Sequence, residues 1–185
     1  KVFNASVPLT IQSGATLAMS TYLLTLSGNL INNGGTASGT TGGVTIAGTA
    51  TQSIGAFTTT GIVSMTKTGG VATFTGNVNG GALTINGNGG TLNLGTGLTQ
   101  GFIDGWTITN GTLDGGASII NFSLAGTMFS GTGGTFTCST STVRLTSALA
   151  QTFPALVYYN LSLALGGVKT TTGVIINGIL SMEGT

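Results

Sequence analysis

Charged residues are nearly absent from this sequence. Lys, Arg, Asp and Glu make up 4% of the 185 residues, against about 25% in a typical soluble domain. Histidine is missing altogether, which removes the most common general base and metal ligand. The basic residues are scattered and form no basic patch, so neither nucleic acid nor an anionic membrane is expected as a partner. They are Lys1, Lys67, Arg144 and Lys169.

The acidic residues are too few for the chemistry that carboxylates perform. Asp104, Asp114 and Glu183 are the only acids. Glycoside hydrolysis needs two carboxylates at a defined separation, and a calcium site needs several oxygen ligands. Asp104 and Asp114 are each followed by Gly, a pairing typical of turns. We therefore expect no enzymatic activity, no bound metal and no cofactor.

Cysteine, proline and long apolar runs are also scarce. Cys138 is alone, which excludes a disulfide framework and a thiolate metal cluster. With two prolines and no strict three-residue glycine period, the chain is not collagen-like. No run of about 18 apolar residues exists, so no membrane insertion is expected. The chain begins at Lys1 without an apolar signal segment. We interpret residues 1–185 as a single domain and as a processed piece or segment of a longer secreted protein.

What the sequence does contain is glycine and short alternating patterns. Glycine occupies 34 positions, and 40% of the residues are hydrophobic. Apolar residues alternate with small polar ones, which is typical of strands with one buried face, whereas helical spacing is almost absent. The alternating pairs are Leu9/Ile11, Leu24/Leu26, Val44/Ile46, Val63/Met65, Leu83/Ile85, Trp106/Ile108, Phe122/Leu124, Val143/Leu145 and Leu161/Leu163.

The spacing of these pairs predicts a repeat architecture. From Leu24 to Leu161 the pairs recur about every 20 residues, within the period of roughly 20–50 residues that marks stacked repeats. We predict an all-β fold, a β-solenoid (parallel β-helix) of about nine coils with roughly 20 residues per coil. At a strand separation of about 4.8 Å, such a rod is about 40 Å long. Asn-Gly steps such as Asn33-Gly34 and Asn110-Gly111 are expected at its corners.

An antiparallel sandwich is the alternative fold. Asn-Gly between two alternating runs also favours a hairpin, and LTINGNGGTLNL (Leu83 to Leu94) has that form. The repeat length, the glycine density and the lack of charged outward residues favour the solenoid instead.

Threonine and aromatic residues raise two binding hypotheses. An ordered Thr lattice on a flat wall would indicate ice binding, but the Thr-x-Thr triplets are unevenly spaced along the chain, so we expect ordinary outward strand residues. The triplets are Thr58/Thr60, Thr66/Thr68, Thr73/Thr75, Thr107/Thr109, Thr135/Thr137, Thr140/Thr142 and Thr170/Thr172. Exposed aromatic rings could stack on sugars, but Trp106 alternates with Ile108 and is expected in the core.

The segment YYNLSLALGGVKTTTGVIINGILSMEGT (Tyr158 to Thr185) resembles a repeat of bacterial secreted β-helix proteins of the adhesin, autotransporter-passenger and extracellular-fibre type. An aromatic and Asn-Leu pair leads into alternating apolar residues, a Gly-rich step and Thr-rich bridging residues, and a final apolar strand follows. The resemblance implies an extracellular or cell-surface location and a role in adhesion or scaffolding rather than catalysis.

Neither end of the sequence has the polar cap that solenoids normally carry. We therefore predict a structural subunit of an extracellular filament or surface fibre that assembles head to tail by β-edge pairing, with further copies of itself as partner. The alternatives are an adhesin segment that contacts a cell surface or glycan, and an ice-binding protein. The predicted assembly residues are Val7, Leu9, Ile11, Ile176, Ile179, Leu180 and Met182.

Overall fold

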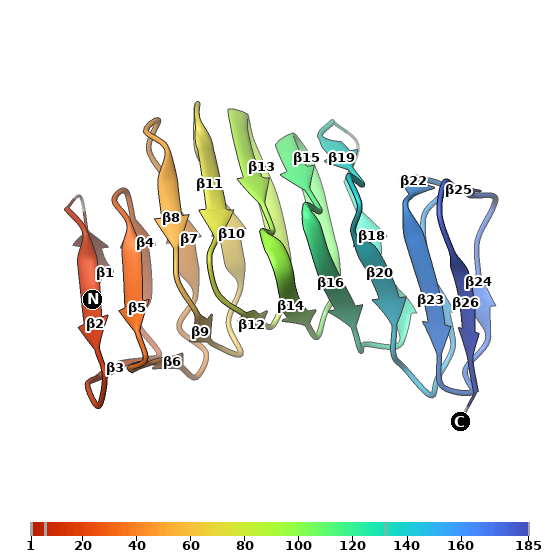
Figure 1. Cartoon of the computed structure of the whole chain (residues 1–185), viewed down its shortest axis with the longest axis horizontal. Coiled ribbons are helices and arrows are strands. Elements are labelled where there is room, and N and C mark those ends of the chain that lie inside the picture. The colour runs from red at the N-terminus through yellow and green to blue at the C-terminus, as the bar shows by residue number, and fades with distance from the viewer. Residues whose placement is uncertain (1, 6, 132, 185) are drawn as a thin grey trace.

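The computed structural model of the protein describes residues 2–5, 7–131 and 133–184. The described chain is all-β, and every pair of named strands is parallel, so each strand lies beside the corresponding strand of the next coil. Figure 1 shows the coils in chain order, with the two termini at opposite ends of the row. The fold prediction is confirmed: the protein is a β-solenoid of about nine coils at roughly 20 residues per turn.

Each coil contributes strands to three walls. Wall 1 contains β1 (Val2–Ala5), β4 (Leu23–Leu26), β7 (Val44–Ile46), β10 (Val63–Met65), the first parts of β13 (Leu83–Asn93) and β15 (Trp106–Asp114), and β18 (Phe129–Ser130). Wall 2 contains β2 (Leu9–Gln12), β5 (Leu30–Asn33), β8 (Gln52–Ile54), β11 (Val71–Phe74), the second parts of β13 and β15, and β19 (Thr135–Thr137).

Wall 3 is an unbroken nine-stranded sheet. It contains β3 (Thr16–Ser20), β6 (Thr36–Gly39), β9 (Phe57–Thr58), β12 (Val78–Gly80), β14 (Thr96–Phe102), β16 (Ala117–Phe122), β20 (Thr142–Leu145), β23 (Asn160–Ala164) and β26 (Leu180–Glu183). Two small sheets complete the last coils: β17 (Gly126–Thr127), β21 (Gln151–Thr152) and β24 (Lys169–Thr170), and the pair β22 (Val157–Tyr158) and β25 (Ile175–Ile176).

The alternating pairs of the sequence do not all lie in one wall. Five of them, from Leu24/Leu26 to Trp106/Ile108, stack in register along wall 1. Leu9/Ile11 belongs to wall 2, and the pairs from Val143 onward belong to wall 3. The two shortest steps in the repeat, Leu9 to Leu24 and Trp106 to Phe122, are short because they pass from one wall to another.

The hairpin alternative is wrong for residues 83–94. Leu83–Asn93 forms one strand, β13, which pairs in parallel with β10, β11 and β15. The Asn-Gly steps bend this strand at the corner between walls 1 and 2, where Gly89 has a φ of 87°. Asn-Gly favours a left-handed backbone in either fold, and only the neighbouring coils decide which corner results.

The interior holds stacked aliphatic and aromatic side chains. Trp106 is buried, as expected, and its ring centroid lies 5.0 Å from that of Phe122 and 4.7 Å from that of Phe136. Aromatic contacts of this geometry add to the stabilisation from burial alone.

Buried polar side chains connect successive coils near the corners. Lys67 is 0% exposed, and its Nζ donates to the carbonyl oxygen of Ala50 and to Oε1 of Gln52, both at 2.7 Å, in the preceding coil. Gln52 Nε2 in turn donates to the carbonyl oxygen of Gly28 at 2.8 Å, one coil further back. Corner carbonyls that the strand ladders leave unpaired are satisfied in this way. Desolvation lowers the pKa of Lys67.

Candidate functional surfaces

Most of the charged side chains of the described residues bond to other parts of the fold. Asp114 Oδ1 accepts from the backbone N–H of Gly116 at 2.9 Å and from Ser139 Oγ at 2.7 Å, and its Oδ2 accepts from Asn93 Nδ2 at 2.7 Å. Asp104 precedes β15, whereas Asp114 ends it, so the two carboxylates lie at opposite ends of that strand. Within residues 2–5, 7–131 and 133–184, no group of three or more His, Cys, Asp and Glu residues gathers.

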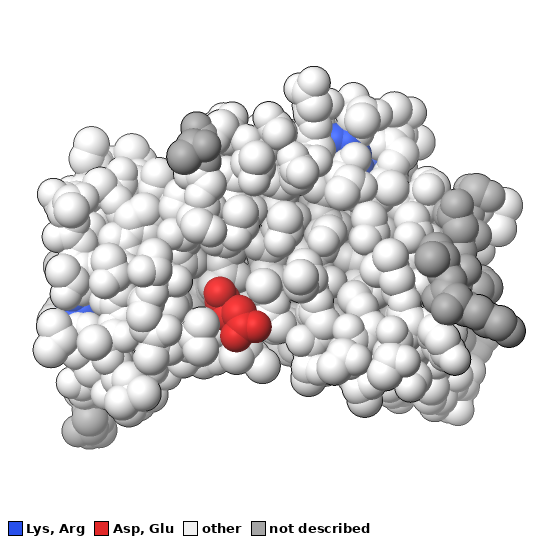
Figure 2. Space-filling view, turned by 180° about the vertical axis from the view of Figure 1, so that it is seen from behind, with Lys and Arg blue, Asp and Glu red and all other residues white. Residues whose placement is uncertain are grey.

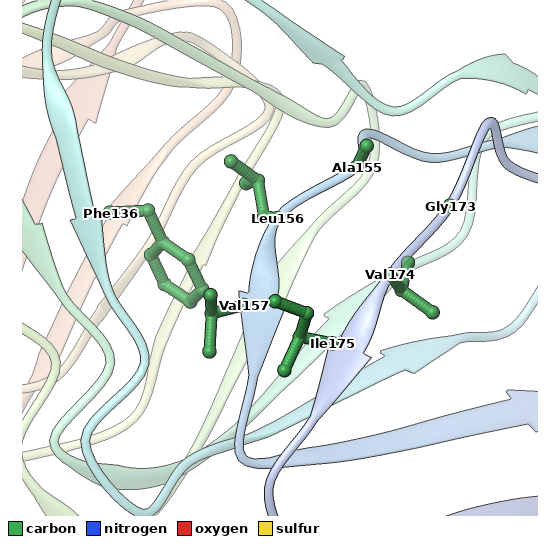
Figure 3. Close-up of a pocket in the computed structure, with 7 residues that line it drawn as sticks. All are labelled: Phe136, Ala155, Leu156, Val157, Gly173, Val174 and Ile175. Atoms are coloured by element: carbon green, nitrogen blue, oxygen red, sulfur yellow. The ribbon is translucent and has the colours of Figure 1, made fainter.

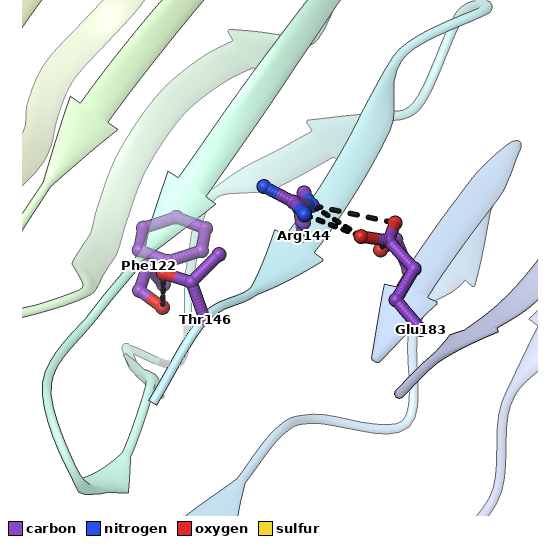
Figure 4. Close-up of polar contacts among 5 residues, drawn as sticks. Phe122, Arg144, Thr146 and Glu183 are labelled. Atoms are coloured by element: carbon purple, nitrogen blue, oxygen red, sulfur yellow. Dashed lines mark hydrogen bonds and ion pairs between the residues drawn. The ribbon is translucent and has the colours of Figure 1, made fainter. Parts of the chain in front are cut away.

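A second tie crosses three strands of wall 3 (Figure 4). Arg144 Nε on β20 donates to Glu183 Oε2 on β26 at 3.1 Å, and Ser162 Oγ on β23 also donates to this carboxylate. The hydrogen bonds from Arg144 and Ser162 lower the pKa of Glu183. Because both charged groups are partly exposed, solvent weakens the pair, which is one cation on one anion and not a catalytic dyad.

The last coil exposes side chains at positions that are buried elsewhere. Leu180 on β26 stands in register with Leu161 on β23, yet 51% of Leu180 is exposed against 1% of Leu161. Met182, in register with Leu163, is 73% exposed. The cause is simple: within the described residues β26 pairs with β23 on one side only. This end coil therefore presents an apolar surface next to an unpaired strand edge.

The predicted assembly residues divide between the two ends of the stack. Ile179, Leu180 and Met182 are exposed on the end coil, whereas Ile176 on β25 is partly buried. At the opposite end, Val7 is exposed and Leu9 is partly buried on β2. Ile11 belongs to the core, packed beside Gly35 of the next coil. Its side chain is thus covered by its own molecule.

An unbroken column of hydroxyl groups runs along the outer face of wall 1. The first five of its residues each lie between two buried apolar residues of their strand and therefore point outward, and Ser130 stands in register with the fifth, Thr107. We call it the hydroxyl column; strand register places its members side by side in consecutive coils. They are Thr25, Thr45, Ser64, Thr84, Thr107 and Ser130.

The hydroxyl column was not predicted from the sequence, although the sequence contains a signal for it. Its first five members are the middle residues of apolar pairs that revealed the repeat, and two of its neighbouring steps join Thr to Thr. The Thr-x-Thr triplets do not form such a column, because they lie on different walls: Thr58 on wall 3, Thr107 on wall 1 and Thr135 on wall 2.

The rear face of the molecule is almost uncharged. Strands β4, β7 and β10 of wall 1 lie behind β5, β8 and β11 in the view of Figure 1. The opposite view shows mainly uncharged side chains with one central acidic patch (Figure 2). None of β4, β7, β10 or β18 contains a charged residue, and the one charge of β15, Asp114, lies in its wall 2 part.

An apolar groove interrupts wall 2 between β19 and the pair β22–β25 (Figure 3). Its volume is about 450 Å³, and no titratable side chain lines it. The lining residues are Phe136, Ala155, Leu156, Val157, Gly173, Val174 and Ile175. Among the described residues, the side chains that line the groove carry no hydrogen-bond donor, acceptor or charge.

Exposed tyrosines do not form a platform for sugars. Tyr22 precedes β4 near one end of the solenoid, and Tyr159 follows β22 near the other. Trp106, the remaining candidate, is buried. Glycan binding through stacked aromatic rings thus has no support in the arrangement of these three residues.

No protein-family model, curated protein or solved structure matches this chain. A search of the described residues for a helix long and apolar enough to cross a membrane finds none.

Proposed function

We propose that this protein is a structural subunit of an extracellular filament or surface fibre, in which the end coil of one molecule stacks on the first coil of the next. The observation that carries the proposal is the end coil, whose inward positions are exposed beside an edge of β26 that no strand of the described residues pairs with. The extracellular setting rests on the resemblance of Tyr158 to Thr185 to secreted repeat proteins.

The two ends have compatible perimeters. The first coil measures 21 residues from Val2 to its register partner Leu23 (23 − 2), and the last measures 19 from Leu161 to Leu180 (180 − 161). Because these lengths differ by two residues, β24, β25 and β26 of one molecule can stack on β1, β2 and β3 of a second. A contact of this kind joins two different surfaces and therefore propagates along one axis.

Side-chain burial alone does not hold such a contact. Fully burying a Leu, Ile or Met side chain contributes roughly 1.5–3 kcal/mol, so Ile179, Leu180 and Met182, each already partly covered, supply about 3–6 kcal/mol together. Association costs about 4–15 kcal/mol in lost translational and rotational freedom. Backbone pairing by β24, β25 and β26 must supply the remainder, which makes assembly cooperative along the edge.

The test is electron microscopy and sedimentation velocity of the purified chain over a range of concentrations. Fibres are expected from the wild type and not from Leu180→Lys/Met182→Lys, because a second coil stacked on this edge would bury two unpaired ammonium groups, at a high cost in desolvation. Ile103→Lys is the matched control, since Ile103 is an exposed apolar residue away from the ends. A wild type that stays monomeric, or fibres of equal length from the end-coil variant, would contradict the proposal.

A further inference from the structure

The hydroxyl column has a repeat that the backbone sets. Its members occupy register-paired positions on neighbouring parallel strands, so consecutive hydroxyl groups lie about 4.8 Å apart. Five such steps from Thr25 to Ser130 span about 24 Å. No loop or insertion breaks the row, because each member is held inside a strand.

Most of the column is free to bind something outside the protein. Thr107 Oγ1 and Ser130 Oγ are 2.9 Å apart and bond to each other. The hydroxyls of Thr25, Thr45 and Thr84 have no such partner among the described residues, and these side chains are partly exposed. A hydroxyl group both donates and accepts, and β-branched Thr is stiff at χ1, so the row is oriented before any partner arrives.

The positions beside the column are uncharged. Gly43 and Ala82 stand two residues before column members, but so do Leu23 and Ile62, which are 39% and 53% exposed. The wall therefore presents apolar groups beside its hydroxyls. Strands β4, β7 and β10 carry no charge, although an acidic patch lies on the same face (Figure 2), so these strands themselves favour an uncharged, polar partner.

We infer that wall 1 binds ice through the hydroxyl column. Ice is a neutral lattice of hydrogen-bond donors and acceptors that repeats at a spacing close to the separation of β-strands. Water molecules held by successive hydroxyls, with the Thr methyl groups beside them, match one row of that lattice. A neutral polysaccharide is disfavoured because Trp106, the one aromatic residue of β4, β7, β10, β13 and β15, is buried. The inference is independent of the proposed end-to-end assembly.

The experiment measures thermal hysteresis and inhibition of ice recrystallisation by the purified protein. Thr84→Tyr places a bulky ring in the middle of the column, and Thr45→Lys places a mobile, hydrated charge there. Thr99→Tyr is the matched control, because Thr99 is an outward residue of the same coil on wall 3. Circular dichroism checks that each variant keeps its strands and its melting temperature.

Hysteresis is expected from the wild type and Thr99→Tyr, with at least a several-fold loss in Thr84→Tyr and Thr45→Lys. A wild type without hysteresis overturns the inference whether or not the variants fold. Equal losses from Thr99→Tyr and Thr84→Tyr also overturn it, as does binding to insoluble cellulose or chitin without any effect on ice, which would assign the wall to a glycan.

Discussion

Replacing Gly111 by Ala tests how closely the coils approach at the corner between walls 1 and 2. Gly111 lies in β15 with a φ of 84°. A Cβ at this position would lie 2.2 Å from the carbonyl oxygen of Gly87 and 2.9 Å from that of Gly90, both in the preceding coil. Neither atom can move without disturbing β13. Gly97 supplies the comparison, because its φ is 68° and nothing lies within 4 Å of its Cβ position.

The two substitutions share one cost and differ in another. A non-glycine residue in the left-handed region costs about 1–2 kcal/mol, which applies to both sites. Overpacking adds about 1–3 kcal/mol at Gly111 alone. Gly111→Ala should therefore destabilise the protein by about 2–5 kcal/mol, and Gly97→Ala by about 1–2 kcal/mol. A chain of this size loses about 2–4 °C in melting temperature per kcal/mol, so the difference between the melting temperatures of the two variants is readily measured.

Thermal unfolding followed by circular dichroism, with a guanidinium titration beside it, gives both values. The reasoning is refuted if Gly97→Ala lowers the melting temperature as much as Gly111→Ala does. That result would mean that backbone conformation, and not the close approach of coils, decides the need for glycine at the corner.

Three further predictions concern polar side chains that bond across the coils. Burial lowers the pKa of Lys67 below 10.5, so the folded state binds this proton less tightly than the unfolded state does, and the free energy of unfolding should rise as the pH approaches 10.5. Chemical denaturation at several pH values should show this rise in the wild type and not in Lys67→Met. Gln100→Leu deprives the buried N–H of Val78 of its acceptor and should lower the free energy of unfolding by about 1–3 kcal/mol in a denaturant titration. Gln12→Leu, at an exposed position, should change it by less than about 0.5 kcal/mol. Glu183→Gln should speed amide hydrogen exchange in β26 at neutral pH and low salt, and an unchanged rate would show that the tie on wall 3 does not hold the end coil.

The sequence was sufficient for the fold because parallel coils place like residues side by side. Leu24, Val44 and Val63 face the core in register, so their spacing along the chain equals the length of a coil. Corners were harder to predict, because Asn86-Gly87 has the same local preference in a hairpin as in a solenoid. Only the strands on either side of β13 decide between the two.

The surfaces were less accessible to sequence reasoning. The burial of Lys67 depends on the carbonyl groups of the preceding coil, which no spacing of residues encodes. The exposure of Leu180 and Met182 depends on the lack of a strand beyond β26 in the described chain. The hydroxyl column depends on strand register across six coils. A single Thr between two apolar residues does not indicate a column until the register of the strands in neighbouring coils is known.

The gap in wall 2 has a mechanical consequence. Between β19 and β22 the described residues form no strand pair, although wall 3 continues from β20 to β23 and β17 pairs with β21. Pulled lengthwise, this joint has no backbone pairing on its wall 2 side to resist separation. A tethered molecule under tension should therefore open there on one side, as a hinge about the paired strands β20 and β23.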